Sequence, residues 1–162
     1  MIDQEVSRDV LEHATRDIFE MMIFMGVERV DPTEFKHLDG NSLLGTITFN
    51  GGIEGCFGFC CSDASAKAVA ASMLGLDPDD EVADQDVNDA IGEVVNMVMG
   101  SIKAAQSVFH DVHVSIPTVI RGRGIEYHPG EGSTGIVDHV KIGDDFSAEL
   151  SLHWHKHAEK KE

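Results

Sequence analysis

The sequence predicts an α+β fold of two layers, in which a largely antiparallel sheet carries two long helices packed on one face. Two stretches repeat apolar residues at helical spacing, around residues 4–25 and 84–107. Two pairs of β-favouring runs are each joined by a turn signal, around residues 50–52 and 143–145. The predicted order is helix, two strands, two helices and three strands, which does not alternate as parallel crossover units would.

The N-terminal stretch, residues 4–25, is expected to form an amphipathic helix that ends at Gly26. Residues 27–37 are expected to form an extended or irregular link, because Pro32 disfavours a helical conformation at Asp31. The apolar side chains of the helix recur at helical spacing: Val6, Val10, Ala14, Ile18, Met21, Met22 and Met25.

A β-hairpin and a short helix are expected next. Residues 42–49 and 53–61 favour strands, and Asn50-Gly51-Gly52 between them is a tight-turn signal. Ser62 or Asp63 can cap a helix through residues 66–74, and Gly75 can end it.

The second half of the chain is expected to hold the long helix, an interrupted strand and another hairpin. The helix begins at Asp84 or Asp86 and runs to about Ser107. Pro117 interrupts the strand over 112–122, which must therefore be an edge, a bulge or a strand entry. A glycine-rich loop over 122–135 precedes the hairpin of residues 135–143 and 146–155. We expect one domain over residues 1–157 and a disordered tail over 158–162.

Composition and charge exclude several classes of function. The net charge of −17 argues against nucleic acid and anionic membranes as partners, because both would repel the chain. No stretch is long and apolar enough to span a bilayer, and the acidic N-terminus is unlike a signal peptide, so we expect a cytoplasmic protein. The three cysteines, Cys56, Cys60 and Cys61, fall within six residues and predict small buried thiols rather than a disulfide framework or a zinc site.

One face of the long helix is polar where a core-facing helix would be apolar. At roughly 100° per residue, five residues share this face: Asp89, Glu93, Asn96, Gly100 and Lys103. The opposite face is aliphatic: Val87, Ile91, Val94, Val95, Val98, Ile102 and Ala105. Gly92 and Gly100 each cost about 1 kcal/mol relative to alanine in a helix interior, and a missing side chain at Gly100 would allow another molecule to approach closely. The alternative is an ordinary solvated face with two tolerated glycines.

The spacing Asp89-x-x-x-Glu93-x-x-Asn96, followed about twenty residues later by Pro117, resembles the signature of the CheC/CheX/FliY family of chemotaxis phosphatases. The element order, the opening helix and the hairpin that ends in FGFCCS before an Ala-rich helix are also similar to that family. The resemblance covers roughly residues 4–155. Members similar to CheC carry two such motifs, whereas here the first helix has only Glu12-x-x-Thr15, which is the arrangement of the CheX branch.

The resemblance implies a protein aspartyl-phosphate phosphatase that acts on a phosphorylated CheY-like receiver. It implies that Asn96 positions the attacking water and that Glu93 pairs with the receiver lysine. Asp89, Gly100 and Lys103 would contact this partner, and Pro117 would fix the backbone beside the helix. The chain would need no cofactor of its own, since the receiver brings Mg²⁺, and it would form a homodimer by joining the sheets of two subunits.

Two other interpretations stay open. The first is a non-enzymatic flagellar or chemotaxis docking module of the same fold, although a pure scaffold has no need for the amide of Asn96. The second is a metal protein, because His153, His155 and His157 would project to one side of a strand; a polar strand end is the simpler explanation. A hydrolase of another type is not indicated, because neither a G-x-S-x-G elbow nor a phosphate-binding loop is present.

Overall fold

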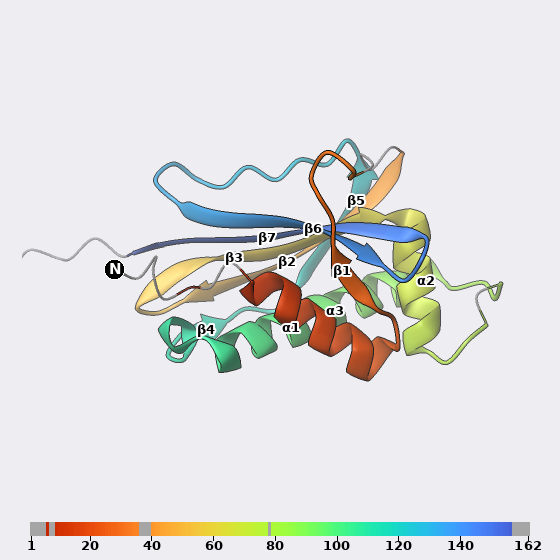
Figure 1. Ribbon diagram of the computed structural model, residues 1–162, viewed down its shortest axis with the longest axis horizontal. Helices are drawn as coiled ribbons and strands as arrows, with labels where there is room; N and C mark the ends of the chain where they lie inside the picture. The colour runs from red at the N-terminus through yellow and green to blue at the C-terminus, as the bar shows by residue number, and fades with distance from the viewer. Residues whose placement is uncertain (1–5, 7–8, 36–39, 78, 157–162) are drawn as a thin grey trace, which may run out of the picture.

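The computed structural model describes residues 6, 9–35, 40–77 and 79–156, and it has the predicted α+β architecture. Figure 1 shows a twisted sheet with helices α1 (Val10–Ile18) and α3 (Asp84–Ala105) against one of its sides and α2 (Asp63–Met73) near its end. The described strands form a seven-stranded sheet in which all pairs are antiparallel. The predicted tail, residues 158–162, lies outside the described residues.

The first helix is shorter and less regular than the sequence predicts. The helix α1 (Val10–Ile18) begins after Asp9, while Val6 lies in a bend rather than a helix. The chain then continues into the π-helical turn η2 (Phe19–Ile23), which ends at Phe24 in the left-handed region, with φ 60° and ψ 34°. The helical segment therefore ends at Ile23, three residues before the predicted stop at Gly26, and Met21 and Met22 within the π-turn are exposed.

Both of the other helices begin close to the predicted residues. Helix α2 (Asp63–Met73) is capped by Ser62, whose Oγ accepts a hydrogen bond from the Ser65 amide at 3.1 Å. Helix α3 (Asp84–Ala105) has two acidic residues in its first turn, where the helix dipole favours them. A short 3₁₀ turn, η3 (Ser107–Phe109), follows it.

The sheet contains both predicted hairpins. Strand β2 (Asn41–Asn50) pairs with β3 (Ile53–Ser62), and β6 (Thr134–Ile142) pairs with β7 (Phe146–Lys156). The two hairpins join where β3 pairs with β7. The predicted irregular link contains a short strand, β1 (Val27–Arg29), which pairs with β6 at one edge.

The interrupted strand forms the opposite edge. Strands β4 (His113–Val114) and β5 (Thr118–Arg123) both pair with β2, and the break between them contains Pro117. Proline cannot donate a ladder hydrogen bond, so it lies just before β5 begins. This edge places β5 beside helix α3.

The core lies between the sheet and helices α1 and α3. One side of each central strand supplies it, with Ile47, Phe57 and Leu150 at most 1% exposed. The aliphatic face of α3 completes it, because Ile91, Val95 and Ile102 are fully buried. Ala105 differs from the prediction: it is exposed because it is the last residue of the helix, beyond the packed surface.

Candidate functional site on helix α3

Helix α3 presents the predicted polar face to solvent. Asp89, Glu93, Asn96 and Gly100 are exposed and Lys103 is half-buried, whereas Val94, the residue next to Glu93, is fully buried. Among the described residues, no side chain pairs with Glu93 or Asn96. Their polar groups are therefore available to another molecule.

A shallow hollow of about 390 Å³ lies beside this face, between α3 and β5. Pro117 lies close enough that a Cβ built on Gly92 would be 3.7 Å from the proline Cβ. Gly92 and Pro117, the residue just before β5, therefore lie next to each other, and the space between them would admit a methyl group in ordinary contact. The residues that line the hollow are Asn88, Asp89, Gly92, Glu93, Pro117 and Val119.

The two glycines of the helix and a third on the sheet have different surroundings. A Cβ built on Gly100 would meet no atom within 4 Å, so this position opens to solvent on the same face as Asn96. A Cβ built on Gly45 of β2 would lie 2.7 Å from Val95 Cγ2 and 3.0 Å from Ile91 Cγ2. Gly45 therefore allows α3 to pack directly against the sheet. This contact sets the distance between the sheet and the polar face of the helix.

An ion-pair network holds the beginning of α3. Arg121 of β5 donates to Asp63 Oδ1 at 2.5 Å and to Asn88 Oδ1 at 3.1 Å. Lys67 also contacts Asp63, at 3.0 Å. Burial tends to raise the pKa of Asp63, but the two cations outweigh it and the pKa lies below its ordinary value. Arg121 thus connects β5, α2 and α3 one residue before Asp89.

The partial echo of the motif on α1 is not an exposed site. Glu12 is mostly buried and bonds to Arg16 and Arg29, so its charge is already neutralised. Thr15 is fully buried within the subunit. Only the motif on α3 presents its polar groups outward, as the missing asparagine in Glu12-x-x-Thr15 suggests.

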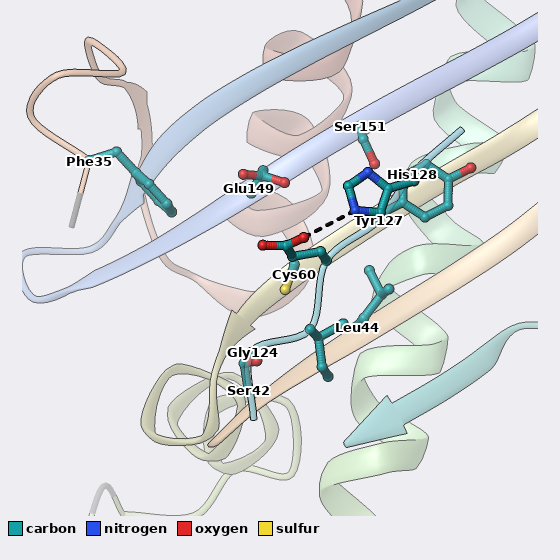
Figure 2. A pocket seen from close by; sticks show the side chains of 11 residues that line it. Phe35, Ser42, Leu44, Cys60, Gly124, Tyr127, His128, Glu149 and Ser151 are labelled. Carbon is teal, nitrogen blue, oxygen red and sulfur yellow. Dashed lines mark hydrogen bonds and ion pairs between the residues drawn. The ribbon is translucent and has the colours of Figure 1, made fainter. Parts of the chain in front are cut away.

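A second hollow, of about 570 Å³, lies on the other face of the sheet, and sequence reasoning missed it. Figure 2 shows Cys60 and Glu149 of the strands between Phe35 on one side and Tyr127 and His128 of the loop after β5 on the other. Burial and the nearby Glu149 raise the pKa of Cys60 to about 11, so the thiol is protonated and a poor nucleophile. No predicted site residue lies in this hollow, and only the folded loop creates it.

The histidine array does not form a metal centre in the described part of the chain. His153 is buried against Tyr127, with ring centroids 5.3 Å apart, and burial lowers its pKa. His155 bonds to Glu54 instead, at 2.5 Å. His157 lies outside the described residues. No group of three metal-binding side chains is found among the described residues, and no described helix could cross a membrane.

Comparisons with known proteins agree with this fold. The family model described as chemotaxis phosphatase CheX matches residues 43–140, which is more than half of the chain. A Thermotoga maritima protein named CheY-P phosphatase CheX is 30% identical over 129 residues, which cover 75% of this chain and 79% of that protein.

Solved structures with lower sequence identity share the fold. The crystal structure of chemotaxis protein CheX from Vibrio vulnificus has a TM-score of 0.76 at 18% identity, over 93% of this chain and 99% of that one. The CheX–CheY–BeF₃–Mg²⁺ complex from Borrelia burgdorferi has a TM-score of 0.66 at 16% identity, over 94% and 99%. From the family model and the Thermotoga relative, we conclude that this chain belongs to the CheX family of chemotaxis phosphatases.

Proposed function

We propose that this chain hydrolyses the aspartyl phosphate of a CheY-like receiver, with Asn96 and Glu93 as the residues that act on the partner's site. The observation that carries the proposal is the exposure of Glu93 and Asn96, one helical turn apart, on a helix whose other face is fully buried. The Thermotoga relative is named a CheY-P phosphatase, and the Borrelia structure contains CheX with CheY, BeF₃ and Mg²⁺.

Asn96 suits the positioning of water. Hydrolysis of an acyl phosphate needs a water in line with the phosphorus and neutralisation of the phosphoryl oxygens, and it needs little other covalent chemistry. An amide has both an acceptor and donors, so it can orient a water without acting as a base. Mg²⁺ and a lysine of the receiver would neutralise the phosphoryl charge. The attack then releases inorganic phosphate and restores the aspartate.

Glu93 suits an ion pair with the receiver lysine. In the free protein no described cation neutralises it, so its carboxylate is available to a partner. A hydrogen bond to a charged group contributes about 1.5–3 kcal/mol. Formed in a site that excludes water, this bond would also fix the angle at which the helix enters the receiver.

The remaining predicted contacts belong to the rim of the same interface. Asp89 borders the hollow at Pro117, and Gly100 leaves open space into which a receiver loop can fit. Lys103 lies further along the helix, where it can meet an acidic residue of the partner. We further propose a homodimer formed through the sheets and a cytoplasmic location, which is where a receiver substrate would be encountered.

The test measures phosphate release from a receiver charged with acetyl phosphate. Asn96→Ala should lower the turnover number at least about 100-fold, because a misplaced water loses orientation, while the half-saturation concentration stays close to wild type. Glu93→Ala should raise the half-saturation concentration about 10- to 100-fold and also lower turnover.

Matched controls separate the site from general surface effects. Asn41→Ala removes an exposed amide from β2, and Glu131→Ala removes an exposed carboxylate from the loop before β6. Both should behave as wild type. A wild-type protein that binds the receiver without accelerating phosphate release would refute the phosphatase and favour the docking module. Normal turnover by Asn96→Ala would refute the role of Asn96 in water positioning and would leave the phosphatase activity itself in place.

A further inference from the structure

One end of the molecule carries an apolar surface that the proposed phosphatase does not use. Eight large hydrophobic residues are exposed in the described part of the chain, and five of them lie near this end. We call these five the Met–Phe patch: Met21, Met22, Phe24, Leu74 and Leu76, which are 71%, 52%, 82%, 53% and 39% exposed. Single exposed apolar residues are normal, but a cluster of this kind marks an interaction surface.

The two halves of the patch are held together by the fold. Ser72 near the end of α2 donates to the Ile23 carbonyl of η2 at 2.5 Å. The Leu76 amide then donates to the Ala71 carbonyl at 2.9 Å, and Gly75, with φ 69°, folds this turn back over the helix. In Figure 1 both segments lie at the right-hand end, where α1 ends beside the lower part of α2.

Phe24 has a conformation that the local sequence does not favour. Its φ is 60°, in the left-handed region that glycine and asparagine occupy readily and that a bulky residue rarely adopts. The ring gains little burial in return, because Phe24 is 82% exposed. Strained and exposed residues of this kind concentrate at functional sites.

Acidic residues border the patch. Asp77, Asp79, Asp80 and Glu81 follow Leu76 directly, and Glu20 lies within η2 between the two apolar segments. All five are exposed, and no basic side chain among the described residues pairs with them. An apolar centre with a negative rim complements a ligand that is apolar on one side and basic at its edges.

We propose that the Met–Phe patch binds an amphipathic basic helix of a partner protein. Methionine side chains are flexible and polarisable, so they adapt to the apolar face of a helix. The carboxylates would meet the lysine or arginine residues that flank this face. The patch lies on η2 and on the turn after α2, whereas the proposed phosphatase residues lie on α3, so the two surfaces can be tested separately.

The test uses a fluorescent model peptide of leucine and lysine in an amphipathic helical pattern, with the full chain, at physiological salt. Phe24→Gly should weaken binding at least about tenfold, as expected for a central aromatic anchor. Glycine accepts the left-handed conformation, so this variant should fold at least as stably as wild type. Asp79→Asn combined with Glu81→Gln should weaken binding and reduce its dependence on salt. Ile120→Ser, which removes an exposed apolar side chain on β5, is the control and should bind as wild type.

Four results would overturn the proposal. The first is equal affinity for wild type and Phe24→Gly. The second is equal affinity for a scrambled peptide of the same composition, which would indicate attraction by net charge alone. The third is a concentration-dependent dimer that Phe24→Gly abolishes, which would make a second copy of the chain the occupant. The fourth is a raised half-saturation concentration for the phosphorylated receiver in Phe24→Gly, which would make the receiver the occupant and leave the phosphatase proposal intact.

Discussion

Gly45 should tolerate a side chain much less well than Gly92, although both lie at the contact between α3 and the strands beneath it. A Cβ at Gly45 would lie 2.7 Å from Val95 Cγ2, closer than real Cβ atoms come to a neighbour. Val95 is β-branched and fully buried on a helix, so its side chain has essentially one rotamer and cannot turn away. Gly45→Ala must therefore move the helix away from the sheet.

The expected cost follows from two opposing terms. Overpacking a well-packed core typically costs about 1–3 kcal/mol. Alanine recovers about 0.5–1 kcal/mol, because it restricts the unfolded chain and suits a strand better than glycine. We expect Gly45→Ala to lower the free energy of unfolding by about 1–2 kcal/mol. It should also lower phosphatase turnover, because the helix that carries Asn96 is displaced.

Gly92→Ala is the matched control. Its Cβ would lie 3.7 Å from Pro117 and 3.8 Å from Val119, which is ordinary contact. Since glycine costs about 1 kcal/mol in a helix interior, this variant should gain up to about that amount. Urea titrations that follow the fluorescence of the buried Trp154 give both values, provided that the slope with denaturant stays unchanged. A Gly45→Ala protein as stable as wild type, or a destabilised Gly92→Ala protein, would refute the packing argument.

Three further predictions concern other parts of the structure. Arg121→Met should lower phosphatase turnover, because it removes the contacts that hold the start of α3. Lys67→Met should leave turnover unchanged, because Lys67 bonds to the same carboxylate as Arg121 but contacts only α2. Equal effects of the two substitutions would contradict this explanation. Burial lowers the pKa of His153 in the folded protein, so the unfolded chain binds this proton first as the pH falls. The free energy of unfolding should therefore decrease as the pH drops below about 6.5. In urea titrations at several pH values His153→Gln should flatten this fall, and an unchanged fall in that variant would contradict the assignment to His153. Cys60, with a pKa of about 11, has about one thiolate in a thousand at pH 8 and should react with iodoacetamide far more slowly in the folded protein than in urea, as measured by peptide mass spectrometry.

The elements that depend on local pattern could be predicted from the sequence. The period of α3 separated the exposed Glu93 and Asn96 from the buried Ile91 and Val95, because a helix of regular geometry fixes which residues share a face. The turn residues predicted the positions of both hairpins. Pro117 predicted the break between β4 and β5, because proline has no amide hydrogen to donate to the sheet. The resemblance of the chain to a known family was confirmed by the family model.

The first helix shows where local pattern fails. Apolar residues repeat through Met25, yet the regular helix ends at Ile18 and a π-turn leads to Phe24. The periodicity of methionines and phenylalanines looks the same whether they face a core or a solvent-exposed corner. Tertiary contacts distinguish the two cases: Ile23, whose carbonyl accepts a hydrogen bond from Ser72 of α2, is buried, whereas Met21, Met22 and Phe24 are exposed.

By itself the sequence determined which residues of α3 face outward, because that depends on helix geometry and on neighbours within a few positions. The tertiary structure decided what surrounds them. Gly45 sets the height of the helix above the sheet, Arg121 holds its first turn, and Pro117 borders the hollow beside Glu93. These contacts join segments that are far apart in the chain, and their distances depend on how the sheet and helices pack, which no local pattern of residues specifies.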